Sequence, residues 1–165
     1  MVQVSIVVPI KNEADNIVAL IEGIQSSCAA FDSFEIIVVD DGSTDTSAEV
    51  VRAEIAKAKN LRLLQHATSG GQSAAVHSGV LAAKGEFVAT LDGDGQNPPE
   101  ELPNLLAPLL AADAPADLGL VAGQRVKRQD TMSKKLASKV ANNLRAAMLK
   151  DGTRDTGCGL KAFRR

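Results

Sequence analysis

Aromatic residues are nearly absent from this chain. Only 2% of the 165 residues are aromatic, and these are all Phe, with no Trp and no Tyr. This composition argues against the aromatic platforms on which single-stranded nucleic acids stack, and against aromatic shelves for sugars. We therefore expect no nucleic-acid partner.

Cysteines and long apolar runs are also scarce. Cys28 and Cys158 are too few for a disulfide framework, and no CxxC spacing indicates a zinc site. A reduced, cytosolic setting is the simplest interpretation. The apolar run VSIVVPI is too short for a signal peptide or a spanning helix, and Lys11 interrupts it. The sequence thus predicts no segment that crosses a membrane.

Several nucleotide and hydrolase motifs are missing. The chain has no GxGxxG after its first apolar run, no GxxxxGK[ST] and no GxSxG. The standard dinucleotide, P-loop and serine-hydrolase interpretations therefore fail. His66 and His77 stand without a partner motif and are expected to be structural or surface residues.

Short β-branched runs alternate with longer helix-like stretches, and 45% of the residues are apolar. Runs that are apolar throughout are typical of strands buried on both faces of a parallel sheet. Strand–helix alternation predicts an α/β fold with right-handed crossovers and a mainly parallel sheet flanked by helices. The expected strands are 2–9, 34–39, 61–65, 86–91 and 118–122. The expected helices are 13–28, 45–58, 71–84, 99–112 and 131–149.

Two helix starts carry recognisable signals. Ser43, Thr44 and Asp45 offer an N-cap before the second helix. The run Pro98-Pro99-Glu100 opens the fourth, because Pro favours a first helical turn.

Charge is divided unevenly along the chain. Residues 1–123 carry 6 Lys and Arg against 17 Asp and Glu, whereas residues 124–165 carry 12 against 3. In the predicted helix 131–149 the apolar residues recur every four positions, while Lys134, Lys135, Lys139 and Arg145 fall on the other side. The segment 124–165 is expected to face phosphate or an anionic membrane surface. A solvated basic helix is the alternative.

Polar clusters follow three of the expected strands, at the edge where ligands bind in such sheets. They are Pro9 to Glu13, Asp40 to Asp45, and Asp92 to Gln96. Asp-Gly pairs are common turn residues, which accounts for one such cluster better than for three. Asp92 and Asp94 would repel each other unless a cation lay between them, and Gln96 adds a further oxygen. All-oxygen ligands predict Mg²⁺ or Mn²⁺, with substrate phosphates sharing the metal.

Four stretches together resemble the family 2 glycosyltransferases of the GT-A fold, and in particular their polyprenyl-phosphate branch. They are VSIVVPIKNEADNI, EIIVVDDGSTDTS, SGGQSAAVHSGVLAAKGEFVATLDGDGQNPPEELP, and GQRVKRQD through DTGCGLKAFRR. They run over nearly the whole chain in the family's order. One departure is the loop 68–71, Thr-Ser-Gly-Gly, where relatives often carry Asn and an aromatic residue.

The resemblance implies roles for individual residues. It implies that Asp92, Asp94 and Gln96 hold the metal, that Arg125, Lys134 and Ser138 contact phosphates, and that Asp94, Arg125 and Asp155 serve catalysis. The residues implied to bind the nucleotide are Pro9, Asn12, Glu13, Asp40, Asp41, Gly71, Gln72 and Asp92.

The resemblance also implies the reaction. A sugar would move, with inversion, from a nucleotide diphosphate sugar to a polyprenyl phosphate, at the cytoplasmic face of a membrane. The chain 1–165 would be a single domain, with 1–123 binding the nucleotide sugar and 124–165 beginning an incomplete acceptor side. A glycan hydroxyl acceptor, with Asp155 as base, and a non-catalytic nucleotide-binding module are the alternatives.

Overall fold

The computed structural model of the chain describes residues 2–124 and 158–165. Residues up to Val121, together with Gly159–Arg165, form one compact unit. The predicted helix 131–149 lies outside the described residues. In the part that the structure describes, no helix combines the length and the apolar character needed to cross a bilayer.

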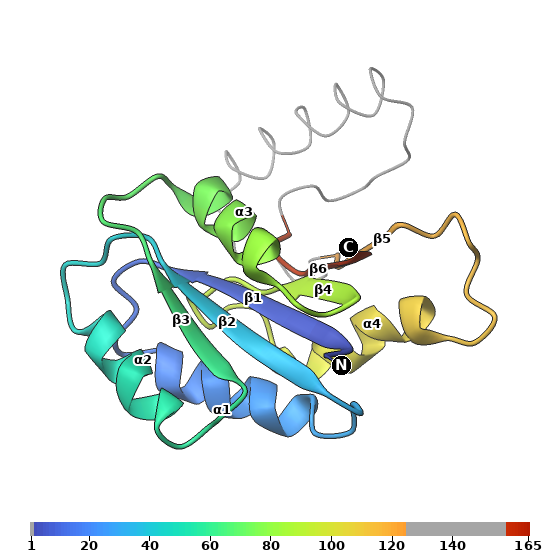
Figure 1. Cartoon of the computed structure of the whole chain (residues 1–165), viewed down its shortest axis with the longest axis horizontal. Helices are drawn as coiled ribbons and strands as arrows, with labels where there is room; N and C mark the ends of the chain where they lie inside the picture. The colour runs from blue at the N-terminus through green and yellow to red at the C-terminus, as the bar shows by residue number, and fades with distance from the viewer. Residues whose placement is uncertain (1, 125–157) are drawn as a thin grey trace, which may run out of the picture. The chain divides into compact units, whose positions relative to one another are not determined.

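A sheet of six strands in the order β3-β2-β1-β4-β6-β5 forms the centre of the fold (Figure 1). The first four strands are β1 (Val4–Ile10), β2 (Phe34–Asp40), β3 (Leu61–Gln65) and β4 (Phe87–Thr90). They pair in parallel, so their carboxyl ends meet at one edge. The predicted α/β fold with a mainly parallel sheet is confirmed.

The last strand, β6 (Lys161–Arg164), was not predicted. It pairs antiparallel with β4, Thr90 opposite Lys161, and separates β4 from the short β5 (Leu120–Ala122). It could not be read from the sequence as a strand because only the middle two of its four residues, KAFR, are apolar, which is too short an apolar run to indicate a buried strand. Its place in the sheet depends on a non-local pairing with β4.

Helices cover both faces of the sheet (Figure 1). One layer contains α1 (Ile17–Ser27), α2 (Ser47–Ile55) and α4 (Leu102–Leu110), and the opposite face carries α3 (Gln72–Ala82). As predicted, Pro99 begins the fourth helical stretch, as the first residue of a 3₁₀ turn, η1 (Pro99–Glu101), that leads into α4.

The second helix begins two residues later than predicted. Asp45 Oδ1 accepts hydrogen bonds from the backbone N and the hydroxyl of Ser47, at 3.0 and 2.6 Å. The side chain of Asp45 therefore satisfies a first-turn amide from outside the helix, and α2 starts at Ser47.

The strands are buried on both faces, which accounts for their apolar sequences. Val7, Val39 and Val88 form a core cluster with Ala75 of α3. Neighbouring residues such as Ile6 point to the other helical layer, because side chains alternate along a strand. A Cβ at Gly79 would overlap Val7, so glycine allows α3 to approach the sheet closely.

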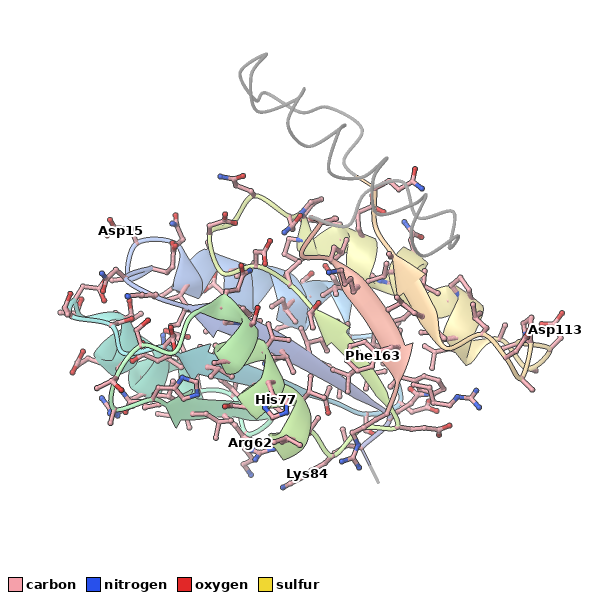
Figure 2. The ribbon with its side chains drawn as sticks, turned by 90° about the horizontal axis from the view of Figure 1, so that it is seen from above. Asp15, Arg62, His77, Lys84, Asp113 and Phe163 are labelled. Carbon is pink, nitrogen blue, oxygen red and sulfur yellow. The ribbon has the colours of Figure 1, made fainter. Side chains whose placement is uncertain are left out.

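A buried polar cluster lies at the amino-terminal edge of the sheet, opposite the predicted site. Glu35 accepts hydrogen bonds from Ser5 Oγ, Arg62 Nη1 and the backbone N of Lys84, each at 2.7 Å. Figure 2 shows Arg62 and Lys84 near one another at this end. Burial alone would raise the pKa of Glu35, but these three donors outweigh it and leave the pKa below its usual value.

Candidate functional site

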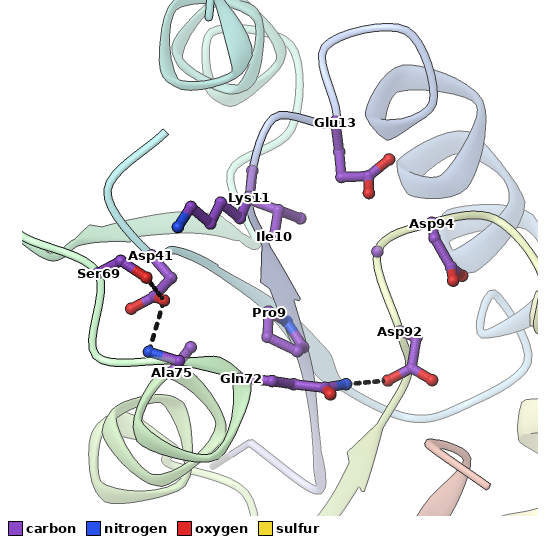
Figure 3. A pocket seen from close by; sticks show the side chains of 12 residues that line it. Pro9, Ile10, Lys11, Glu13, Asp41, Ser69, Gln72, Ala75, Asp92 and Asp94 are labelled. Atoms are coloured by element: carbon purple, nitrogen blue, oxygen red, sulfur yellow. Dashed lines mark hydrogen bonds between the residues drawn. The ribbon is translucent and has the colours of Figure 1, made fainter. Parts of the chain in front are cut away.

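A cavity of about 430 Å³ opens at the carboxyl ends of β1, β2 and β4 (Figure 3). Its walls come from the segments that follow these strands and from the start of α3, as expected for a parallel sheet. It is lined by Pro9, Ile10, Lys11, Glu13, Asp41, Ser69, Gly71, Gln72, Ala75, Asp92, Gly93 and Asp94.

Asp41 forms one end of the cavity, and its carboxylate is tied to the segment 66–71. Oδ1 accepts from His66 Nδ1 at 2.7 Å and from the backbone N of Gly70 at 2.8 Å. Oδ2 accepts from Ser69 Oγ at 2.6 Å and from the backbone N of Gly71 at 2.8 Å. The bonds from Ser69, Gly70 and His66 hold the pKa of Asp41 well below its usual range. The residue is therefore an anion throughout the neutral range.

Close backbone packing brings these two segments together. Gly42 has φ +69°, and a Cβ there would lie 2.9 Å from the backbone N of Ser69. The backbone N of His66 also donates to Asp40 O at 2.9 Å. His66 itself is held on its other side, where Nε2 lies 2.9 Å from Ser78 Oγ. The wall at Asp41 is thus fixed by both side chains and backbone.

The opposite end of the cavity is formed by Asp92 and Asp94 after β4 (Figure 3). Asp92 is held by side-chain amides: Gln72 Nε2 donates to Oδ1 at 2.6 Å and Asn97 Nδ2 donates to Oδ2 at 3.1 Å. Gly159 also lies against this carboxylate, since a Cβ there would overlap it. The hydroxyl of Thr90 donates to Gly159 O at 2.7 Å, which fixes the glycine beside Asp92.

Asp94 differs from Asp92 in its hydrogen-bond partner, which is a backbone amide and not a side-chain amide. It is exposed, and its Oδ1 accepts from the backbone N of Gln96 at 3.0 Å. Among the described residues, no cluster of three or more His, Cys, Asp or Glu side chains could hold a metal alone. Two carboxylates beside an open cavity do fit a hard divalent cation that takes its remaining oxygens from a phosphate ligand and water.

The cavity carries an excess of negative charge. Glu13, Asp41, Asp92 and Asp94 face it, and Lys11 is the one cation among the described residues that line it. An anionic ligand would be repelled by this set of charges without a bound cation. A divalent cation beside Asp92 and Asp94 would reduce this repulsion for a phosphate compound.

The loop after β1 is anchored to the loop after β2. Asn12 adopts φ +58°, its backbone N donates to Ser43 Oγ at 2.9 Å, and its Oδ1 accepts from the backbone N of Thr44 at 2.8 Å. The backbone N of Glu13 donates to Ser47 Oγ at 2.8 Å. These bonds fix the backbone that presents Lys11 and Glu13 to the cavity.

The structure brings most of the described site residues together. Seven of the predicted residues line the cavity: Pro9, Glu13, Asp41, Gly71, Gln72, Asp92 and Asp94. Asn12, Asp40 and Gln96 are not in this lining, and Asp40 is buried, accepting from the backbone N of Ser43 at 2.9 Å and from Gln65 Nε2 at 3.1 Å. Their roles toward a ligand stay predictions. The remaining predicted residues lie outside the described residues: Arg125, Lys134, Ser138 and Asp155.

Sequence reasoning assigned no role to five residues of the lining, although three of them lie inside the predicted polar clusters: Ile10, Lys11, Ser69, Ala75 and Gly93. Lys11 stands inside the predicted loop between Pro9 and Asn12, so its position in that motif was an available signal. Ser69 stands in the loop 68–71 that departs from the family pattern, but its bond to Asp41 joins positions 28 residues apart and could not be predicted.

Comparison with known proteins identifies the family. The family model described as glycosyl transferase family 2 matches residues 5–165. The chain belongs to glycosyl transferase family 2. The resemblance expected from the sequence is therefore confirmed for the family.

Curated relatives within this family include transferases named for undecaprenyl phosphate. The undecaprenyl-phosphate 4-deoxy-4-formamido-L-arabinose transferase of Pectobacterium carotovorum is 39% identical over 98% of this chain and 49% of the relative. The enzyme of the same name from Salmonella choleraesuis is 37% identical over 99% of this chain and 49% of the relative. The chain thus spans about half the length of the curated relatives it matches.

Solved structures of other glycosyltransferases share the fold. A mannosyltransferase from Pyrobaculum calidifontis, solved with GDP-Man and Mn²⁺, has a TM-score of 0.72 and 29% identity over 99% of this chain and 44% of its own. Glucosyl-3-phosphoglycerate synthase from Mycobacterium tuberculosis, solved with UDP, has a TM-score of 0.75 and 26% identity. The match covers 98% of this chain and 56% of the synthase. The GT-A fold expected from the sequence is confirmed.

Proposed function

We propose that this chain carries the donor-binding part of an inverting glycosyltransferase that moves a sugar from a nucleotide diphosphate sugar to a polyprenyl phosphate. The observation that carries the proposal is the cavity between Asp41 and the pair Asp92 and Asp94, in a chain of glycosyl transferase family 2. The named acceptor of the curated relatives supports the polyprenyl phosphate.

The nucleotide sugar would lie across the cavity, with its nucleoside toward Asp41 and its diphosphate toward Asp94. Mg²⁺ or Mn²⁺ would be held by Asp92 and Asp94, with Gln96 as a further oxygen ligand. The excess of carboxylates in the lining favours this arrangement, because the diphosphate would otherwise meet like charge. The two solved relatives with GDP-Man and Mn²⁺ or with UDP support a nucleotide ligand of this kind.

The chemistry follows from the charge that develops on the departing diphosphate. When bound, a divalent cation supplies Lewis-acid stabilisation of that charge. Arg125 and Lys134 would add positive charge beside the phosphates, with Ser138 as a hydrogen-bond donor. A polyprenyl phosphate is already ionised near neutral pH, so Asp155 would orient the acceptor and no strong general base is required.

The acceptor places the reaction at a membrane. We expect the basic segment 124–165 to lie against anionic headgroups at the cytoplasmic face, each cation contributing about 1 kcal/mol near such a surface. The protein would then be peripheral, held by charge.

Two experiments test the proposal: the first measures binding of nucleotide sugars, and the second measures transfer of the sugar to an acceptor. Calorimetry with UDP, GDP, CDP and ADP sugars is run with Mn²⁺, with Mg²⁺ and with chelator, and we expect one nucleotide to bind in the presence of metal. Radiolabelled donor is then offered with undecaprenyl phosphate or with soluble glycans. Transfer to the glycan alone would replace the proposed acceptor. Metal-dependent binding without transfer or donor hydrolysis would favour a non-catalytic nucleotide-binding module.

A further inference from the structure

The nucleoside end of the cavity has a carboxylate without free acceptor sites. A carboxylate offers about four lone-pair positions. Those of Asp41 are filled by four hydrogen bonds of 2.6 to 2.8 Å, from His66, Ser69, Gly70 and Gly71. The side chain of Asp41 is also only 4% exposed. A hydrogen-bond donor on a ligand would therefore have to displace one of these bonds.

Lys11, in contrast to Asp41, has hydrogen-bonding groups that no described residue occupies. It is exposed and lines the cavity, and its ammonium makes no hydrogen bond or ion pair with any of the described residues. Figure 3 shows its side chain extending toward Asp41 and Ser69 and away from Asp94. A cation beside four carboxylates that pairs with none of them remains available to a ligand.

We infer that Lys11 is a specificity-determining residue that recognises the base of the nucleotide through a carbonyl oxygen. This inference rests on the proposed function, which puts the nucleoside at the Asp41 end. An ammonium group has three donors and no acceptor, so it selects an acceptor on its partner. Uracil O4 and guanine O6 are such acceptors, whereas cytosine and adenine present an amino group at the corresponding position. The pocket would accordingly favour UDP and GDP compounds over CDP and ADP compounds.

The experiment compares four nucleoside diphosphates with Mn²⁺ on the chain and on Lys11→Met. The variant loses a hydrogen bond from a charged donor, so we expect the preference for the carbonyl-bearing base to fall about tenfold or more. Affinity for CDP and ADP should stay the same. Lys11→Arg keeps a donor-only cation and should retain the preference.

Lys59→Met is the matched control, because Lys59 is exposed just before β3, at the amino-terminal edge of the sheet. It should leave all four affinities unchanged. An equal loss for all four nucleotides in Lys11→Met would overturn the inference and make Lys11 a phosphate contact. Unchanged affinities, or a preference of the unmodified chain for CDP or ADP, would also overturn it. If the unmodified chain binds none of the four, the proposed function itself fails.

Discussion

The side-chain amide of Gln72, the first residue of α3, donates a 2.6 Å hydrogen bond to Asp92, which follows β4. The preceding residue, Gly71, donates its backbone N to Asp41 after β2, at 2.8 Å. Two consecutive residues therefore connect the two ends of the cavity. The orientation of Asp92 depends on the segment that Asp41 holds in place.

Replacing Gln72 with Ala should weaken the binding of UDP or GDP with Mn²⁺ about five- to tenfold. The lost hydrogen bond is worth about 1 kcal/mol. Oδ1 of Asp92 would lose its bond from Gln72, while Asn97 would still hold Oδ2, so the carboxylate would be less firmly oriented toward the ligand. Calorimetry measures the effect. Gln25→Ala removes a similar 2.9 Å bond to Asn60, remote from the cavity, and should have no effect on affinity. Equal affinities in the two variants would contradict the role of Gln72.

Asp94→Ala should remove the dependence of nucleotide binding on metal. Asp94 is exposed at the cavity, and among the described residues its Oδ1 accepts a bond from a backbone amide of its own loop, so it is the more accessible carboxylate of the acidic pair. Titrations with Mn²⁺ and with chelator should then give the same affinity. Asp113→Ala makes the same change at an exposed position outside the lining and should keep the metal dependence. Persistent metal dependence in Asp94→Ala would place the cation elsewhere.

Glu35→Ala should lower the free energy of unfolding by about 3 kcal/mol, because it leaves Arg62, Ser5 and the backbone N of Lys84 without their acceptor. Denaturant unfolding measures the loss, and nucleotide affinity of the folded protein should be unchanged. Glu49→Ala breaks an exposed pair with Arg52 at 3.7 Å and should cost under about 0.5 kcal/mol. Similar costs for the two variants would show that the buried cluster adds no stability.

Stability should fall below about pH 4. The pKa of Asp41 is lower in the folded chain than the value of about 3.9 in an unfolded one. Its stabilising contribution is therefore complete above the unfolded pKa and is lost as the pH falls toward the folded pKa. Glu35 and Asp45, whose pKa values are also lowered, add to this acid dependence.

Asp41→Asn should make the unfolding free energy less dependent on pH between about 2 and 4, because the titrating group is gone. Asp15→Asn is the control at an exposed position, and its pH profile should follow that of the unmodified chain. Chemical denaturation at a series of pH values gives both profiles. If the unfolding free energy of Asp41→Asn depends on pH as steeply as that of the unmodified chain, other carboxylates cause the loss of stability in acid.

Vesicles with anionic lipid should bind the chain weakly, and neutral vesicles should not. The reason is the basic segment 124–165, with 12 Lys and Arg against 3 Asp and Glu. Binding should decrease steeply with salt, because exposed charges are screened beyond about 8 Å at physiological ionic strength. Lys135→Glu with Lys139→Glu should abolish it and spare nucleotide binding. If the chain sediments equally with anionic and neutral vesicles, the segment 124–165 does not bind an anionic surface and is solvated instead.

The parallel strands and the acidic residues at the two ends of the cavity could be predicted from the sequence. Buried strands are apolar throughout, and polar residues begin where they end, so Asp41 and Asp92 could be placed at one edge of the sheet. The four bonds to Asp41 could not be predicted, since they depend on how the segment 66–71 turns back on β2. The role of Lys11 also required geometry, because a lysine in a loop is ordinarily solvated.

The position of β6 constrains how the chain can fold during synthesis. Thr90 and its partner Gly159 are 69 residues apart, so β4 leaves the ribosome long before the strand that completes its outer side. Until then, one edge of β4 exposes unpaired backbone groups, a template for pairing with another chain. The sheet is therefore completed late, and the nascent chain can associate through the open edge of β4 until β6 has been synthesised.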